Sequence, residues 1–533
     1  MSCSKDSDLL AEYVVADTRI QGRFVVDDFF FVSLSGSTTL DVLANDGIDE
    51  EDSATITDVT QPDNGTVTLN DNSTITYTPD TPNSPDTSND AEETADTFTY
   101  TVEVDNGDGT ATMSEGDVIV NSSRQNPEAA SLQSYGAVGD GITDDTAAIQ
   151  SAFDNETDIT SDPNKTYLIS SSLVLDQNMA QIIDLNGSTI TRNGHVHWML
   201  FIDKREYSNS LTTIRNLKID GNDKSGSTID IKSRVHFENI EIYDVIHDNA
   251  NGIRILVYDE PGIYGQSVFD NVNIHNLESV NSNGSSGDNP GMVHGFLVSA
   301  QETPSQTTQI VYKNSDLFRL WGEDAGGITL NSPGFDTSNS PLSFWFENIS
   351  VRDAQRRTVK SFIGNTTWIN STFVSAANDN PKLVSATKGG LNPAGLFVIA
   401  SSSSATGSTN NLVCGCSFEG HPDDPFDSWY TQVLIQNQNG PAGAEIRNSR
   451  FTGGHGGRWK ANGITAFGGL ESLTIANTTF GTTNTIKALG SVSGTFKLDT
   501  NNTYADGKST VLAPSTMSYT EINMPFEACP TID

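Results

Sequence analysis

An asparagine recurs in one short sequence context between residues 180 and 480. One or two apolar residues precede it and alternating apolar residues follow it; the marked positions are Asn216, Asn239, Asn271, Asn314, Asn348, Asn370, Asn448 and Asn477. The gaps between them are 23, 32, 43, 34, 22, 78 and 29 residues. A minimum spacing near 22 residues with longer insertions is typical of a solenoid whose coils carry loops on one face.

The residues around each asparagine alternate between apolar and polar, as in the stretch from Glu238 to Tyr243. This period of two predicts β-strands as the building units. An asparagine at a sharp turn can satisfy backbone groups that the turn leaves unpaired, and stacked copies can bond to one another. The sequence therefore predicts structural rather than catalytic roles for these asparagines.

The chain has 533 residues, with 29 Lys+Arg against 69 Asp+Glu and a formal charge of −40. Nucleic acid is not expected as a partner, because phosphate neutralisation needs a basic surface. Residues 1–121 are especially acidic, with 26 acids and three bases. This charge indicates either a solubilising surface or calcium-binding loops. No apolar run approaches the 18 residues of a membrane-spanning helix.

Four cysteines in 533 residues do not predict a disulfide framework. Cys414 and Cys416 are expected on one face of a strand, both as buried fillers of the coil interior. The start of the chain, Met1 to Asp6, resembles a mature bacterial lipoprotein, and the resemblance implies a lipid on Cys3; a chance free thiol is the alternative. The pair His195 and His197 lacks further ligands that would make a metal site.

The expected organisation begins with a tether (1–22) and an all-β domain (23–121) that contains seven short strands. Such a strand pattern favours a sandwich. Motifs within it, at residues 40–47, 64–67 and 98–102, resemble the cadherin-like, immunoglobulin-like modules of bacterial surface proteins, which act as spacers or adhesion modules. A linker (122–131), the solenoid (132–510) and a C-terminal cover (511–533) follow.

The stretch from Tyr135 to Gln150 combines a glycine-rich turn with a short amphipathic helix. Thr143 or Asp144 is expected to cap this helix, which would bury Ile149 and Phe153 and cover the open end of the solenoid. The stretch resembles the N-terminal motif of the pectate-lyase-like superfamily of right-handed parallel β-helices. The resemblance implies that fold for residues 132–510, and places the chain among hydrolases, lyases, epimerases and tailspikes that share it.

Three consecutive long gaps, of 32, 43 and 34 residues, surround residues 245–345, so the sequence predicts a cleft there. Four stretches on successive coils are candidates: Asp248 and its neighbours, His294 before a glycine, the pair Glu323-Asp324, and a basic segment with Arg356, Arg357 and Lys360. Their order is similar to the sites of polygalacturonase-type hydrolases. In this chain, however, the histidine precedes the acid pair, and the basic segment has one extra residue.

The resemblance implies hydrolysis of an acidic polysaccharide. Asp248, Glu323 and Asp324 are the candidate general acid and base, and His294 would orient an acid or bind the sugar. Adjacent acids on a strand point to opposite faces, so both could serve only at a bend. Arg356, Arg357 and Lys360 would bind a carboxylate or sulfate, and the tryptophans, Trp321 among them, offer stacking platforms or pack within coils.

Two alternatives remain open at this stage. A polysaccharide lyase would use Lys360, Arg357 or His294 as the base, with calcium held by acids near Asp324; hydrolysis needs no cofactor. The same groove could also bind glycan without cleaving it. In each case the expected partner is an acidic polysaccharide and the expected location is the bacterial surface or the exterior, with membrane attachment only through a lipid anchor on Cys3. Oligomeric state is not predicted.

Overall fold

The computed structural model describes residues 25, 28–32, 37–43, 46, 53–70, 72–80, 95–105, 111–122, 129–279, 292–332, 337–354, 357–374, 396–401, 407–420, 431–437, 440–453, 462–467, 470–481, 484–489, 494–504, 511–512 and 519–532. The chain divides into two compact units, Met1–Pro127 and Glu128–Asp533. Among the described residues, no helix has both the length and the hydrophobicity that crossing a membrane requires.

The N-terminal unit contains two small sheets and all seven of the expected strands. One sheet has the order β1-β7-β6-β3 and the other β2-β5-β4. The strands are β1 (Asp28–Val32), β2 (Thr38–Leu40), β3 (Ser53–Val59), β4 (Gly65–Leu69), β5 (Ile75–Pro79), β6 (Ala95–Asp105) and β7 (Ala111–Ser122). Alternate residues such as Phe98, Tyr100 and Val102 form a buried core separate from that of the C-terminal unit. This is expected where two sheets each bury one face.

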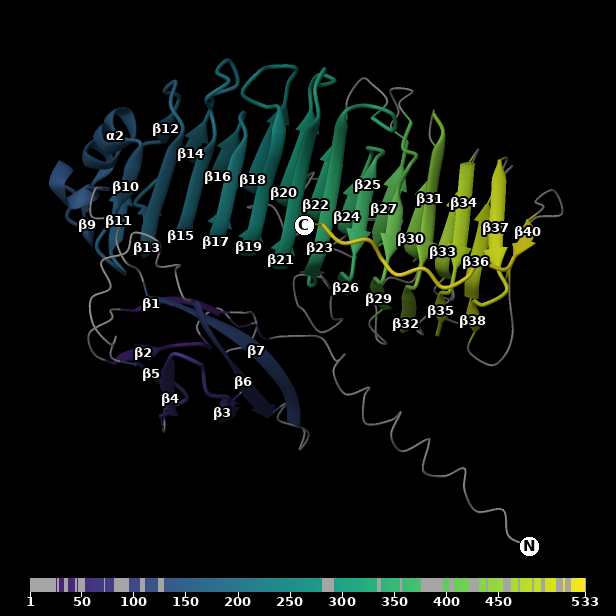
Figure 1. Ribbon diagram of the computed structural model, residues 1–533, viewed down its shortest axis with the longest axis horizontal. Coiled ribbons are helices and arrows are strands. Elements are labelled where there is room, and N and C mark those ends of the chain that lie inside the picture. Colours follow the sequence, from purple (N-terminus) through teal and green to yellow (C-terminus); the bar gives the residue numbers. More distant parts are fainter. Residues whose placement is uncertain are drawn as a thin grey trace, which may run out of the picture. The chain divides into compact units, whose positions relative to one another are not determined.

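The C-terminal unit is built from two long sheets whose neighbouring strands run parallel (Figure 1). The 12-stranded sheet contains β12 (Leu173–Leu175), β14 (Trp198–Ile202), β16 (Ser227–Ile231), β18 (Ala250–Val257), β20 (Met292–Ala300), β22 (Glu323–Asn331), β24 (Arg357–Ser361), β27 (Phe397–Ala400), β30 (Thr431–Gln436), β33 (Asn462–Phe467), β36 (Asn484–Leu489) and β39 (Val511–Leu512).

The 21-stranded sheet supplies the rest of each coil. It contains β8 (Ala130–Ser131), β9 (Asp140–Asp144), β10 (Asp158–Thr160), β11 (Thr166–Ile169), β13 (Gln181–Arg192), β15 (Thr212–Ser225), β17 (Val235–Ile246), β19 (Gly265–Glu278), β21 (Thr308–Trp321), β23 (Leu342–Val351), β25 (Thr366–Ile369), β26 (Thr372–Val374), β28 (Leu412–Cys414), β29 (Ser417–Gly420), β31 (Ala442–Arg447), β32 (Arg450–Gly453), β34 (Leu470–Ala476), β35 (Thr479–Phe480), β37 (Thr495–Asp499), β38 (Thr503–Tyr504) and β40 (Thr520–Ile522). Each coil contributes strands to both sheets, so the unit is a parallel β-helix. The predicted fold class is confirmed.

The marked asparagines form a corner within the 21-stranded sheet. All eight adopt left-handed backbone, with φ between 46° and 62°, a conformation that asparagine tolerates better than most residues. The side chains bond along the coils: Asn239 donates to Asn216 at 3.1 Å, and Asn271 donates to Asn239 at 3.0 Å. Their predicted structural role is confirmed. The 78-residue gap conceals one more coil, in which Gly415 (φ 70°) occupies the corner.

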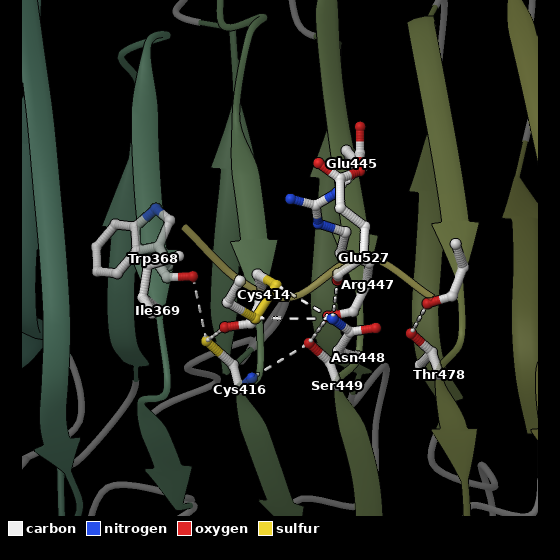
Figure 2. The surroundings of a disulfide bond; sticks show 12 residues. Trp368, Ile369, Cys414, Cys416, Glu445, Arg447, Asn448, Ser449, Thr478 and Glu527 are labelled. Carbon is white, nitrogen blue, oxygen red and sulfur yellow. Dashed lines mark hydrogen bonds and ion pairs between the residues drawn. A yellow bond between two sulfur atoms is a disulfide. The ribbon is translucent and has the colours of Figure 1, made fainter. Parts of the chain in front are cut away.

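The same corner explains why the prediction for Cys414 is wrong. Gly415 turns the chain between β28 and β29, so Cys414 and Cys416 do not lie on one continuous strand. Cys414 forms a disulfide with Cys529, 115 residues further on (Figure 2). Cys416 is free and buried, as expected, and burial raises the pKa of its thiol to about 12.

The C-terminal segment runs back over this corner after β40 pairs with β37 (Figure 1). Asn501 donates to the Met524 carbonyl at 3.0 Å, and Asn448 donates to the Glu527 carbonyl at 2.8 Å. The Glu527 carboxylate accepts from Arg447 at 2.6 Å (Figure 2). We call residues 523–529 the C-terminal strap, because they join three coils that are separate in sequence.

The interior is filled by stacked apolar side chains, one layer for each coil. Trp368 is fully buried, with its ring 4.0 Å from that of Phe346 and nearly parallel to it. The expected helix, α2 (Thr146–Asn155), buries Ile149 and Phe153. The cap prediction is wrong: Asp145 is the N-cap residue and makes no side-chain cap bond, because its carboxylate accepts from the backbone of Val138 and Gly139 in the preceding turn. The 3-10 helix η2 (Leu132–Tyr135) precedes this turn.

Candidate functional site

The register of the 12-stranded sheet brings several of the predicted residues onto neighbouring strands. His294 on β20 pairs with Gly326 on β22, which pairs with Arg357 on β24. Lys360, also on β24, pairs with Thr329. Because neighbouring strands are about 4.8 Å apart, His294 and Arg357 lie about 10 Å apart across the sheet, although 63 sequence positions separate them; Lys360 lies three residues further along β24.

His294 is buried and lies against a side chain of the next strand. Its side chain is 6% exposed, and Nδ1 lies 2.9 Å from the Thr329 hydroxyl on the next strand. Lys360 extends over the ring of Phe362, with its ammonium nitrogen 5.1 Å from the ring centre. Arg357 is half-buried. Strands β20 and β24 therefore carry three nitrogen-bearing side chains, of which His294 is buried and Arg357 and Lys360 are half-buried.

The acid pair lies at an irregularity in the same sheet. Glu323 pairs with Met292 and Gly326 pairs with His294, so three steps along β22 match two along β20. The extra residue forms a β-bulge at Asp324 and Ala325, directly after the paired Glu323. Bulges re-aim side chains and are common next to active sites. The backbone thus has the bend that a shared orientation of two adjacent acids would need. The side chains of both acids lie outside the described residues.

The remaining predicted residues are placed less compactly. Asp248 is exposed in the turn before β18, and this turn is joined to β20 by a 3.4 Å bond from the Met292 amide to Asn249. Trp321 ends β21 and is 6% exposed. Arg356 and Cys3 lie outside the described residues. Within the part of the chain that the structure describes, no three His, Cys, Asp or Glu side chains are grouped to hold a metal.

A second polar cluster, which sequence reasoning missed, lies on the outer face of the 21-stranded sheet. Glu241 accepts from Lys218 at 3.0 Å and lies 3.2 Å from His275 Nε2. The His275 ring is stacked between those of Tyr243 and Phe318, nearly parallel to both. Register aligns Lys218 and Glu241 on adjacent strands. No local motif marks these residues, which meet only through coil stacking.

This cluster predicts acid-sensitive stability. Burial raises the pKa of Glu241, but Lys218 and His275 more than offset this and lower it to about 2, from 4.5. A depressed folded-state pKa adds stability above the unfolded value, which is lost as pH falls. We expect wild type to lose about 3 kcal/mol from this group between about pH 5 and pH 2, whereas Glu241→Gln lacks this component. Denaturant unfolding at several pH values measures it, with exposed Glu471→Gln as control. Parallel pH curves for wild type and Glu241→Gln would contradict the prediction.

A comparison with known protein families supports the prediction that the N-terminal unit is an immunoglobulin-like module. Residues 21–121 match the bacterial Ig domain family. No curated protein matches the chain. The expected resemblance to an immunoglobulin-like bacterial module is therefore confirmed for this part of the sequence.

Several solved structures are similar to the chain in fold. The A-module of the mannuronan C-5 epimerase AlgE4 of Azotobacter vinelandii is 14% identical, with a TM-score of 0.38, and the match covers 68% of this chain and 98% of that one. The catalytic unit of an α-1,3-glucanase of Streptomyces thermodiastaticus is 14% identical, with a TM-score of 0.37 and coverage of 82% and 76%. ORF18 of Geobacillus virus E2 is 14% identical, with a TM-score of 0.33; the match covers 71% of this chain but only 62% of that protein. These similarities concern fold alone, so activity must be argued from the residues of this chain.

Proposed function

We propose that the β-helix cleaves an acidic polysaccharide by hydrolysis on the outer face of the 12-stranded sheet. One observation carries the proposal: the sheet register puts the acid pair, Glu323 and the bulged Asp324, on the strand that lies between those of His294 and Arg357. Acidic and basic residues that are distant in sequence thereby lie on three neighbouring strands of one sheet. Hydrolysis of a glycosidic bond needs two carboxyl groups on either side of that bond.

In this mechanism one carboxyl group acts as the general acid and another as the general base. One carboxylic acid protonates the leaving glycosidic oxygen while a second carboxylate, from the pair or from Asp248, takes a proton from the attacking water. His294, fixed by Thr329, orients an acid or a sugar hydroxyl. Arg357 and Lys360, with Arg356, bind the carboxylate or sulfate of the substrate, and Trp321, which ends β21 just before the acid pair in the chain, contributes to substrate binding. No cofactor is required.

One observation favours a second reaction, β-elimination. The described side chains of the cluster, His294, Arg357 and Lys360, are all nitrogen bases. A lyase needs such a base to remove the proton next to a uronate carboxylate, and a cation to neutralise that carboxylate. In that reaction calcium held near Asp324 would supply the second charge.

Product analysis on a panel of uronic, sulfated and neutral glycans tests these proposals. We expect shortened chains with new reducing ends and no near-ultraviolet absorbance from the uronic or sulfated glycans. Absorbing, unsaturated ends would establish elimination instead. Binding without any shortening would indicate a glycan-binding protein, and the absence of both binding and cleavage would refute a role in glycan recognition.

We further propose that the protein works at the cell surface or outside the cell. The Cys414–Cys529 disulfide supports this, because such bonds persist in oxidising compartments. The match of residues 21–121 to a bacterial Ig domain is consistent with a spacer at the surface. A lipid on Cys3 would anchor the protein there. Mass spectrometry of the N-terminal peptide from the native host decides that point, since an unacylated Cys3 would exclude the anchor.

A further inference from the structure

Alternating charges lie on, or directly after, the strands β14, β16 and β18 of the 12-stranded sheet. Arg254 on β18 bonds through Nε to Asp230 on β16 at 2.6 Å. Lys232, two residues after Asp230, lies 3.3 Å from the Asp203 carboxylate. The other oxygen of Asp203 lies 3.4 Å from Nε of Arg205. Three cations and two acids thus form two ion-paired groups, which the chain from Asp230 to Lys232 brings close together. We call them the β14–β18 cation row.

Each cation of the row also lies over an aromatic ring. The Arg254 guanidinium is 4.4 Å from the centre of the Trp198 ring. The Lys232 ammonium is 4.7 Å from Phe201 of the preceding coil, and the Arg205 guanidinium is 4.7 Å from Tyr258, two coils further on. Stacking on a ring and pairing with a carboxylate together fix the position of a long side chain that would otherwise be mobile.

The two arginines keep part of their hydrogen-bonding capacity free. Arg254 is 30% exposed and Arg205 is 31% exposed. In both, the ion pair engages Nε, and within the described part of the chain the two terminal amino groups make no hydrogen bond. When Nε is engaged in the ion pair, the two terminal amino groups of the guanidinium can still donate hydrogen bonds to two oxygens of a carboxylate or sulfate. The ordering cost of binding is reduced, because the side chain is already fixed.

The charge balance of the row also favours an anion. Three cations against two acids leave one net positive charge, in a chain whose overall charge is −40. Asp230 is 1% exposed and Asp203 is 18% exposed, whereas both arginines are more open. Within the row, the guanidinium groups are therefore more accessible to a ligand than the two carboxylates.

We infer that the β14–β18 cation row is a binding subsite for the anionic groups of a uronate-bearing or sulfated glycan. The inference rests on the proposed function, whose reacting residues lie on the adjoining strands: β18 carries Arg254 and pairs directly with β20, which carries His294. From β14 to β24 the sheet spans five strand spacings, about 24 Å. A glycan that runs along the axis of the β-helix, across successive coils, would be held at the cation row on one side of the acid pair and at Lys360 on the other side.

This arrangement determines what kind of glycan the protein prefers. A long acidic chain contacts both ends of the span, whereas a short fragment contacts one. Cleavage between the two anchored ends falls inside the polymer, so the subsite makes the enzyme act internally rather than from chain ends. Neutral glycans gain nothing from the row.

Binding measurements on the full chain test the inference without relying on cleavage. Arg205→Ala and Arg254→Lys are the variants; the lysine keeps the charge beside buried Asp230 but lacks the planar fork. Arg215→Lys is the matched control, because Arg215 has similar exposure and an aspartate partner at 2.8 Å on the 21-stranded sheet. Affinity electrophoresis in polygalacturonate, in a sulfated polysaccharide and in a neutral glucan gives the dissociation constants, with melting temperature recorded for each variant.

We expect both cation-row variants to bind the acidic polymer about tenfold more weakly, with neutral glucan and the Arg215→Lys control unchanged. The acidic polymer whose binding the substitutions weaken more, polygalacturonate or the sulfated polysaccharide, identifies uronate or sulfate as the preferred anion. Wild-type affinity of both variants for both acidic polymers, with cleavage retained, would overturn the subsite and leave the proposed function standing. No binding of any acidic polymer by the wild type would remove the proposed function as well.

Discussion

Replacing the acids of the β22 bulge should abolish glycan cleavage without changing the melting temperature. Glu323→Gln and Asp324→Asn each keep the size of the side chain but remove its ability to exchange a proton at neutral pH. Loss of one general acid or base lowers the rate about 10²–10⁴-fold. Because the bulge interrupts strand pairing only locally, the stacked interior is expected to be unaffected. Initial rates on the best substrate of the glycan panel, with thermal unfolding of the same samples, measure both quantities.

The controls separate chemistry from binding. Glu471→Gln, an exposed acid on β34, should keep full activity. The acid-pair variants should retain the wild-type affinity for polygalacturonate, because the anion-binding residues Arg357 and Lys360 are unchanged. Wild-type turnover in both acid-pair variants would dismiss the pair as catalytic groups. Activity that disappears together with folding would show a structural role instead.

The asparagine corner was predictable because its cause is local. A left-handed backbone position at every turn favours asparagine, and alternating neighbours favour strands, so each coil leaves its own mark in the sequence. Where glycine meets the same backbone requirement, as at Gly415, the mark disappears. The interval from Asn370 to Asn448 therefore looked like one long insertion although it contains two coil spacings.

Contacts between coils could not be predicted in the same way. Arg254 and Asp230 are 24 residues apart, and Lys218 and Glu241 are 23 apart; their pairing depends on the exact register of neighbouring coils. Insertions of varying length between the marked asparagines hide that register. The candidate residues between 248 and 360 were predicted from a family resemblance and from their order along the chain. Coil stacking then places His294, Arg357 and Lys360, which are distant in sequence, on neighbouring strands of one sheet.

The disulfide was missed for a related reason. Cys529 lies beyond the repeats, and nothing near it indicates that the chain turns back over the corner. Its partner appeared to be an interior residue, because Cys414 and Cys416 are separated by one position. The left-handed turn at Gly415 overrides that spacing and leaves only Cys416 in the main apolar core.

Loss of the Cys414–Cys529 bond should destabilise the C-terminal coils specifically. The bond closes a 115-residue separation, for which chain entropy alone gives about 5 kcal/mol, although measured losses are typically about 2–4 kcal/mol. Coils of a solenoid contact only their neighbours, so release of the C-terminal strap should affect the last coils and leave β13–β19 intact. The double variant Cys414→Ser/Cys529→Ser is expected to show a lower unfolding free energy and faster amide exchange in residues 519–532.

A matched variant distinguishes the covalent bond from the contacts beside it. Glu527→Gln removes the ion pair with Arg447 while the disulfide stays in place, and because Glu527 is 67% exposed its loss should cost less than about 1 kcal/mol. Reduction of the wild type should reproduce the double-serine variant, since both free the strap. If oxidised and reduced protein exchange the amides of the strap at equal rates, the hydrogen bonds from Asn448 and Asn501 are sufficient to hold it, and the disulfide has no stabilising role at this end of the β-helix.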